Sequence, residues 1–348
     1  MSAIENVPDY VVTVNGTDIT GKLKGRIPEP NGRSRARLIG LRLSEKRGGD
    51  ADELELTIDD SDGGMALPPT GATIEVSLGW SAGSLVKVGL VDKGRFTVDS
   101  VEHSGPPDIV TVRARSADMT SAIVTRREQS WSKTTLGAVL RAVAARNKLT
   151  PRIAPVLADI AVTTLSQARE SDMALLRRLG REHDAVATVK GGALIFTAIG
   201  AGITSSGKPI PGAALTRAVG DRHSFRIEKR EEVGTVEASW HDRKGAKKQV
   251  AKAGKGEGTT RRLTRTYPTE AAAKQAAQAE HSRAARAPMK LDLGLALGRL
   301  DLYPDRPMTV SGFKAEIDQV KWLIADVTHE LQADRGFTSA VTLENLNI

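Results

Sequence analysis

Apolar side chains alternate along two short segments near residue 100, and this alternation limits more than any other feature what the chain can fold into. The alternating residues are Phe96, Val98, Val110 and Val112. A period of two is the pattern of half-buried β-strands, because successive side chains point to opposite faces of a sheet. Between the segments, residues 104–107 contain a glycine and two prolines, which favour a turn. The sequence therefore predicts a β-hairpin over residues 94–115.

Directly after this hairpin the apolar spacing becomes helical. Apolar residues recur three and four positions apart at Leu136, Val139, Leu140, Val143 and Ala144. We predict a helix over residues 134–147, with threonine hydroxyls at its start as N-caps. A second helix is predicted to begin at Ser171-Asp172, and strands at 185–189 and 193–198 are predicted to pair around a Gly-Gly turn.

Strand signals also dominate the N-terminal region. Residues 10–14 are followed by Asn15-Gly16, a strong hairpin signal because both central residues of a type I′ turn need positive φ. A further alternating segment covers residues 73–78. Together with the hairpin near residue 100, these segments indicate an antiparallel β-barrel or sandwich.

The C-terminal region returns to strands, which are expected over residues 223–227, 233–240 and 261–267, and it repeats the central hairpin. The residues that match at a constant offset of 226 are Phe96 and Trp322, Val98 and Ile324, Val101 and Val327, and His103 and His329. This offset indicates two related β modules that flank an insertion. We expect each aromatic residue to face the core of its own module. We expect the two histidines to be structural residues at strand ends rather than ligands.

The expected fold class is α+β, mainly β. A chain of 348 residues is longer than the chains that usually fold around a single hydrophobic core, so more than one domain is expected. The expected division is a first β-barrel domain (1–118), an inserted α/β domain (119–200) and a second β-barrel domain (201–348). The last of these should contain an alanine-rich helix over about residues 269–287.

One stretch, residues 243–265, carries the whole net charge of +8. It contains nine lysines and arginines against a single glutamate. It also contains four glycines, and it has no aromatic residue on which a nucleic-acid base could stack. We interpret it as a mobile, solvated basic loop or hairpin tip, with an electrostatic contact surface as the alternative.

The residue types present exclude or disfavour several kinds of site. The chain has no cysteine, which excludes disulfides and thiolate chemistry. Its six histidines are scattered along the sequence. Residues 59–64 resemble a calcium loop, but Gly71 stands where a bidentate glutamate is needed. Residues 202–208 fit a phosphate-binding loop, but Pro209 supplies no hydroxyl for Mg²⁺ and opposes a helix there. No catalytic residue, cofactor site or metal site is therefore predicted.

Membrane and secretion signals are also missing from the sequence. There is no run of about 18 apolar residues, and no basic segment followed by an apolar one at the N-terminus. We therefore expect no membrane anchor, and we expect synthesis and first folding in a cytoplasm.

A set of short motifs extends through nearly the whole chain in a fixed order. They are residues 94–101, Gly105-Pro106, 114–119, Ser130-Trp131, Thr135-Leu136, Ser171-Asp172 with Leu175, and 310–331, which contains Ile317-Asp318, Trp322, Val327 and His329. In order and spacing these motifs resemble the late control protein D family of contractile phage tails. Members of that family are baseplate hubs and are similar to the N-terminal part of type VI secretion spike proteins.

This resemblance implies a homotrimer in which each subunit contributes two tube-like antiparallel β-barrels to a ring of six. Such a ring would join a six-fold tail tube to a three-fold spike. The implied partners are therefore the tail spike protein, the tail tube protein and other baseplate proteins. The implied location is the virion tail baseplate, or that of a tail-like particle, after synthesis in the bacterial host cytoplasm. The implied role is structural and not enzymatic.

Two other functions stay open as alternatives. A cell-wall-degrading tail enzyme would need a positioned carboxylate pair or a metal triad containing histidine. His329-Glu330 comes nearest to a metalloprotease motif, but Ala333 stands where its second histidine is needed. A basic nucleic-acid-binding protein would use residues 243–265, and a salt-dependent gel shift would reveal it, although no specific nucleic-acid binding is expected.

Overall fold

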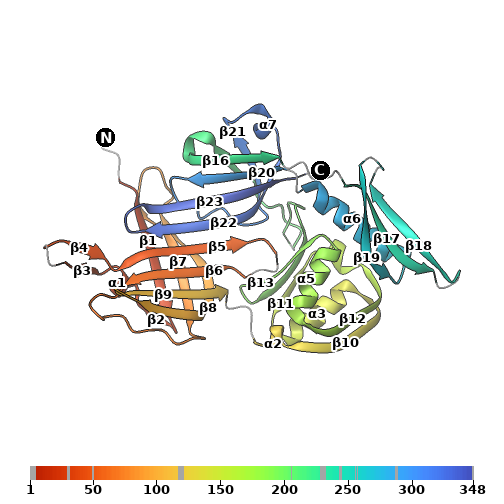
Figure 1. Ribbon diagram of the computed structural model, residues 1–348, viewed down its shortest axis with the longest axis horizontal. Coiled ribbons are helices and arrows are strands. Elements are labelled where there is room, and N and C mark those ends of the chain that lie inside the picture. Colours follow the sequence, from red (N-terminus) through yellow and green to blue (C-terminus); the bar gives the residue numbers. More distant parts are fainter. Residues whose placement is uncertain are drawn as a thin grey trace.

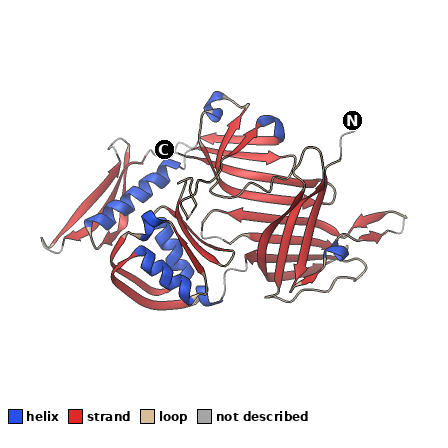
Figure 2. Cartoon of the chain, turned by 180° about the vertical axis from the view of Figure 1, so that it is seen from behind, coloured by secondary structure: helices blue, strands red, loops and turns tan. Residues whose placement is uncertain are grey.

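The chain is mainly β, with its long helices in one part of the molecule and short helices beside the strands elsewhere (Figures 1 and 2). This computed structural model describes residues 5–29, 32–48, 51–116, 121–204, 206–227, 233–242, 245–254, 256, 258–286 and 289–346. The predominance of strands confirms the prediction from apolar alternation.

The N-terminal part is built almost wholly of strands. Its elements are β1 (Val7–Val14), β2 (Thr17–Asp18), α1 (Thr20–Leu23), β3 (Arg26–Pro28), β4 (Ser34–Ala36), β5 (Leu38–Lys46), β6 (Glu53–Asp59), β7 (Thr73–Ala82), β8 (Gly89–Ser104) and β9 (Ile109–Ser116). The predicted hairpin near residue 100 is confirmed as β8 and β9. The Asn15-Gly16 turn is also present, and both residues have positive φ as this turn requires.

A small α/β unit follows. Its elements are α2 (Ser121–Val124), β10 (Arg126–Thr135), α3 (Leu136–Arg146), β11 (Thr150–Ile153), α4 (Pro155–Ala158), β12 (Ala161–Ser171), α5 (Asp172–Glu182), β13 (Ala185–Lys190) and β14 (Ala193–Ala198). The predicted N-caps are confirmed, because Thr135 and Ser171 accept hydrogen bonds from the backbone N–H groups of Ala138 and Ala174. The long antiparallel pair β10–β12 was not predicted, because its side chains are mostly exposed and show no apolar alternation.

The C-terminal part returns to strands. Its elements are β15 (Ala213–Thr216), a 3₁₀ turn (Arg217–Val219), β16 (Gly220–Ile227), β17 (Val233–Asp242), β18 (Lys247–Gly254), β19 (Thr259–Tyr267), α6 (Glu270–Arg286), β20 (Met289–Leu295), β21 (Pro307–Ser311), α7 (Ala315–Asp318), β22 (Trp322–Gln332) and β23 (Gly336–Asn345). The alanine-rich segment forms α6, whose cap Thr269 accepts a hydrogen bond from the backbone N–H of Ala272.

The expectation that residues 243–265 form a mobile loop or hairpin tip was wrong for most of the stretch, whereas the strand expected over residues 261–267 is present within β19. Most of its described residues form β18 and β19, which flank β17 in a three-stranded sheet covered by α6. Small apolar residues between the charges, such as Ala251, pack with Val236 and Ala277 in a core of their own. These few apolar positions were hidden among lysines and arginines, which explains the error. Residues 243, 244, 255 and 257 lie outside the described residues.

One large sheet runs through both the N-terminal and the C-terminal parts. Its strand order is β16-β20-β23-β22-β5-β6-β9-β8-β7-β1-β2, and β15 and β21 join it beside β22. The two parts meet where β22 pairs antiparallel with β5, and Figure 1 shows these two strands side by side. Among the described residues this path is open, with β16 at one end and β2 at the other.

Five strands of the N-terminal part recur in the same order in the C-terminal part. The strands β5-β6-β9-β8-β7 correspond to β16-β20-β23-β22-β21. The central hairpins also share their register, since Phe96 pairs with Ser116 as Trp322 pairs with Asn345. The repeat predicted from the offset of 226 residues is therefore confirmed, and we call these two sets of strands the first and second repeats.

β-Bulges fall at equivalent positions of the two repeats. In the central hairpins the register shifts at Val98/Ser100 and at Ile324/Asp326. In the outer strands it shifts at Leu38/Gly40 in β5 and at Gly220/Arg222 in β16. A bulge is a feature of strand pairing and not of residue type, so two shared bulges support the repeat independently of the apolar pattern.

Phe96 and Trp322 belong to different cores. Phe96 is 1% exposed in the core of the first repeat, and Trp322 is fully buried in the core of the second. Both face inward, as expected from the sequence. The first core also receives Phe337 from β23, whose ring centroid lies 5.3 Å from that of Trp80. The α/β unit has a third core, and α6 with β17–β19 has a fourth.

We expect Phe96→Ala and Trp322→Ala each to lower the free energy of unfolding by about 3 to 5 kcal/mol, because each removes a large buried side chain. The two losses should add to within about 0.5 kcal/mol, since the residues lie in different cores. Denaturant unfolding of both single variants and the double variant measures this. Tyr303→Ala, at a residue that is 39% exposed, is the control and should cost less than about 1 kcal/mol. Midpoints near that of the wild type for both buried residues would contradict the assignment.

Candidate functional site

The junction between the two repeats is held by a regular antiparallel register. Pairing runs from Asp326 opposite Lys46 to Gln332 opposite Gly40. On one face of the junction Ser44 Oγ lies 3.4 Å from Thr328 Oγ1. The side chains of Arg42 and Glu330, which are also opposite each other, form an ion pair at 3.5 Å. Polar contacts across β5 and β22 therefore match the backbone register.

A buried group of charged side chains lies on the other face of this junction. Glu45 of β5, Lys93 of β8 and His329 of β22 are all almost fully buried. Lys93 Nζ lies 2.8 Å from Glu45 Oε2 and 3.3 Å from His329 Nε2. His329 Nε2 is in turn 3.4 Å from Glu45 Oε2. We call these three residues with Lys190, Asp52 and Ser339 the junction cluster.

Burial controls the protonation of His329. Burial lowers the pKa of His329 below its ordinary value, which favours the neutral ring. Its Nδ1 lies 2.7 Å from Ser339 Oγ. A neutral ring with its proton on Nε2 would donate to Glu45 and accept from the hydroxyl of Ser339 through Nδ1, so both ring nitrogens would have partners.

Glu45 stays ionised in spite of its burial. Burial raises the pKa of Glu45, but the hydrogen bond with His329 and the charges of Lys93 and Lys190 outweigh it and hold that pKa well below its usual range. A buried carboxylate with these partners is compensated, and removal of a partner would leave it uncompensated.

Lys190 connects the α/β unit to this cluster. It ends β13, and its Nζ lies 3.1 Å from Glu45 Oε1 and 2.7 Å from Asp52 Oδ2. Burial lowers the pKa of Lys190, but Glu45 and Asp52 outweigh this and raise it. Burial also raises the pKa of Asp52 against the opposing effect of Lys190. The cluster thus joins three parts of the chain, namely both repeats and the α/β unit.

The matched histidines are not equivalent in their surroundings. His329 lies within β22 and is fully buried, whereas the side chain of His103 is 44% exposed and its Nε2 is 3.6 Å from Asp60 Oδ2. The expectation that His329 is structural agrees with its contacts, but it lies inside a strand and not at a strand end. Its neighbour Glu330 is also in β22, so the helical geometry of a metalloprotease motif is not formed.

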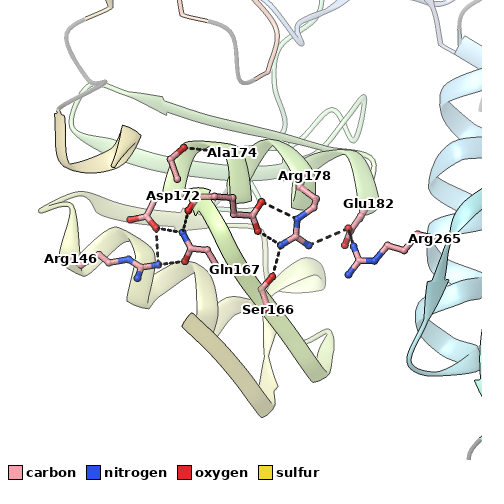
Figure 3. Close-up of polar contacts among 10 residues, drawn as sticks. Arg146, Ser166, Gln167, Asp172, Ala174, Arg178, Glu182 and Arg265 are labelled. Atoms are coloured by element: carbon pink, nitrogen blue, oxygen red, sulfur yellow. Dashed lines mark hydrogen bonds and ion pairs between the residues drawn. The ribbon is translucent and has the colours of Figure 1, made fainter. Parts of the chain in front are cut away.

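A second buried carboxylate organises the α/β unit (Figure 3). Asp172 is fully buried at the start of α5. Its oxygens accept hydrogen bonds from Asn147 Nδ2 at 2.7 Å and Gln167 Nε2 at 2.8 Å, and Arg146 Nη2 lies 2.9 Å away. These contacts tie α3, β12 and α5 together. The sequence marked Asp172 as a helix start, but nothing local indicated its burial.

Arginines connect the α/β unit to the sheet of β17–β19. Arg178 of α5 pairs with Glu170 and Glu182, and Glu182 also pairs with Arg265 of β19, as Figure 3 shows. Arg283 of α6 donates to the backbone carbonyl of Arg181. Arg265, which belongs to the stretch expected to be a loop, therefore helps to hold two parts of the chain together.

Other cations of the basic stretch also have acidic partners. Glu237 pairs with Lys252 and with Arg262, in each case at 2.9 Å. Arg261 pairs with Glu280 at 2.8 Å. Exposed ion pairs of this kind contribute little stability, but they reduce the positive field that nucleic-acid binding would need.

The two loop motifs that resemble ligand sites are structural turns. In the first, Asp59 pairs with Arg35 and Asp62 pairs with Arg37, so protein cations hold the carboxylates. In the second, Ile203 forms an isolated β-bridge with Pro209, and no helix follows. Within the described ranges, no group of three or more histidines and carboxylates has the geometry of a metal site. In the same ranges, no helix is long and apolar enough to cross a membrane.

We expect Lys93→Met to lower the free energy of unfolding by about 3 kcal/mol, because it leaves Glu45 without its closest buried partner. Adding Glu45→Gln to that variant should restore part of the loss, giving a coupling energy on the order of 1 kcal/mol in a double-mutant cycle. The control is Lys46→Met, which removes the more exposed pair with Glu53 and should cost less than about 1 kcal/mol. Equal losses at positions 93 and 46 would contradict the role of the cluster.

Acid should weaken the fold through His329. Because burial lowers its pKa below the ordinary 6.5, the unfolded chain takes up a proton first as the pH falls through that value. Stability is then lost on acidification, by on the order of 1 kcal/mol from pH 7.5 to pH 5.5 for this group. His329→Gln should reduce this loss, because the variant has no titratable ring at this buried position. Identical pH profiles for the wild type and His329→Gln, measured by urea unfolding, would refute the assignment.

Known proteins resemble this chain along nearly its full length. Residues 53–335 match the model of the phage tail baseplate hub (GPD) family. The probable baseplate hub protein of Escherichia phage P2 is 38% identical over 376 residues, covering 97% of this chain and 93% of that protein.

Two solved structures show the same fold at low identity. The 43 kDa tail protein of prophage MuSo2 from Shewanella oneidensis has a TM-score of 0.67 at 15% identity, covering 97% of this chain and 98% of the other. A component of the Escherichia coli type VI secretion system, described as structurally similar to T4 bacteriophage tail proteins, has a TM-score of 0.53 at 12% identity, covering 97% and 77%. With 38% identity to the P2 protein over almost the whole chain, this protein belongs to the phage tail baseplate hub family.

Proposed function

We propose that the protein is the structural hub of a contractile tail baseplate and acts as a homotrimer. Each chain supplies two barrel-like modules, so three chains form a ring of six. The ring joins the six-fold tail tube to the three-fold tail spike, and the spike, the tube protein and other baseplate proteins are its partners. Its place is the tail baseplate of the virion or tail-like particle, after synthesis in the bacterial host cytoplasm.

The five-strand repeat is the observation that carries this proposal. Two sets of strands share their order, the register of the central hairpin and the positions of two bulges. A chain with two equivalent units can present a pseudo-six-fold surface when three copies combine. Such a closed ring also leaves no sheet edge unpaired, which would remove a source of aggregation.

The proposed division of the chain follows the same logic. The first module covers residues 1–118, the α/β insertion covers 119–200, and the second module covers 201–348. The insertion leaves the sheet after β9 and returns near β15, so it lies outside the repeated strands. Its contact with the junction cluster through Lys190 would keep it in a defined position beside the ring.

The role proposed is mechanical and needs no chemical step. The relatives at 38% identity are named as hub proteins. The buried charges described above have protein partners that explain them, including Lys93 and Lys190 for Glu45 and Arg146 for Asp172. We therefore assign these charges to positioning of the chain's parts.

The mass of the purified protein, alone and with its spike, tests the proposal. Light scattering at micromolar concentration should give three chains per particle, either for the protein alone or once the spike is present. A complex with the spike that contains only one or two copies of the chain would contradict the ring.

A further inference from the structure

Two strand edges of the chain are open at positions equivalent to the paired junction. Within the chain, the C-terminal half of β22 pairs with β5. The equivalent part of β8, residues 99–104, pairs with β9 on one side, and the described strands leave its other side open. β16 is the equivalent of β5, and it pairs on one side with β20 and ends the large sheet.

We propose that the open edge of β8 in one copy of the chain pairs antiparallel with β16 of a second copy. This inference rests on the proposed hub function, and it adds to it the strands and the register of the contact. The paired residues are Val101 with Ile227, Glu102 with Arg226, His103 with Phe225, and Ser104 with Ser224.

The register follows from the correspondence between the two repeats. Residues of β22 map onto β8 by subtracting 226, as their pairing with β23 and β9 shows. Residues of β5 map onto β16 by adding 182: Leu43 pairs with Leu54 of β6 as Phe225 pairs with Leu291 of β20. Applied to His329 opposite Leu43 within the chain, these two offsets place His103 opposite Phe225 between chains.

Side chains on the core face of the two edges suit each other. Val101 packs against the core of the first repeat, and Phe225 packs against that of the second, with its ring centroid 6.2 Å from that of Trp322. Ile227, on the same face of β16, is 61% exposed in the single chain. Pairing would set Ile227 against Val101 and continue the apolar layer from one core to the next.

The opposite face carries complementary charge. Glu102 and Arg226 are both exposed and come opposite each other in this register. They stand where Thr328 contacts Ser44 at the junction within the chain. Their present partners, Arg113 and Asp292, lie on the neighbouring strands β9 and β20, so the four charges would alternate in sign across the interface.

The contact joins two different surfaces, the β8 edge of one copy and the β16 edge of the next. Each copy therefore has one neighbour at each edge. Figure 1 shows β16 and β8 at opposite ends of the stacked strands. A head-to-tail contact of this kind forms a ring when its rotation closes. With two repeats per chain, three such contacts alternate with three junctions of the β5–β22 type around the ring of six.

Cross-linking tests the register directly, because the chain contains no cysteine. Directly opposite residues of an antiparallel pair have Cα atoms about 4.5 to 5.5 Å apart, within the range of a disulfide. The double variant Glu102→Cys with Arg226→Cys, oxidised as the assembled protein, should give covalent dimers and trimers on a non-reducing gel. These species form a ladder on the gel, and no covalent species larger than three chains should appear in it.

The matched control moves one cysteine two residues along β16. Glu102→Cys with Ser224→Cys places the Cα atoms about 7 to 8 Å apart, beyond disulfide reach, and should cross-link at least tenfold less. Equal cross-linking of the two pairs would overturn the register. Trimers by mass with no ladder from positions 102 and 226 would overturn the strand contact and leave the trimer standing. Absence of trimers for the wild type, alone and with its spike, would instead refute the proposed function.

Charge reversal gives a second readout without any cross-link. Glu102→Arg and Arg226→Glu should each lower the trimer fraction several-fold at micromolar concentration, and their combination should restore it. The melting temperature of the separated chain should not change by more than a few degrees, since both residues are exposed. An unchanged trimer fraction in both single variants would contradict the contact.

Discussion

The pairing of β22 with β5 is the interaction on which the rest of the structure depends. Among the described strands, removing it would divide the large sheet into its two repeats. Replacing a buried ion pair by apolar packing often costs little stability, whereas removing one partner costs several kcal/mol because the other charge is left uncompensated. A slip of one residue would move Glu45 to the opposite face and away from Lys93 and His329. The contacts of the junction cluster therefore form in the observed register of β5 and β22 and would be lost on such a slip.

Charge pairs also connect the remaining parts of the chain. Lys190 brings the α/β unit to Glu45 and Asp52, and Arg265 brings the sheet of β17–β19 to Glu182. Each part has its own apolar core, so its folding and its placement have different physical origins. Apolar burial forms the parts, and geometrically demanding charge pairs orient them.

Sequence patterns predicted the strands that have one buried face, the capped helices and the repeat. Phe96 and Trp322 were found because alternation marks the inward side of a strand. Three kinds of feature were not predicted from the sequence. The strands β10 and β12 expose most of their side chains, and β18 carries few apolar residues among its charges. The junction cluster has no local signal at all, because Glu45 and Lys190 are 145 residues apart and Lys93 and His329 are 236 apart.

The distance along the chain between β5 and β22 also sets an order of events during synthesis. Their side chains meet across 284 residues, and among the described strands only β23 follows β22. At about 5 to 20 residues per second, β5 waits tens of seconds on the ribosome before its partner exists. Through this time Glu45 and Lys93, both from the early half, place charge beside that edge, and charged edges resist pairing with stray strands. The large sheet can therefore become continuous only after β22 has been translated.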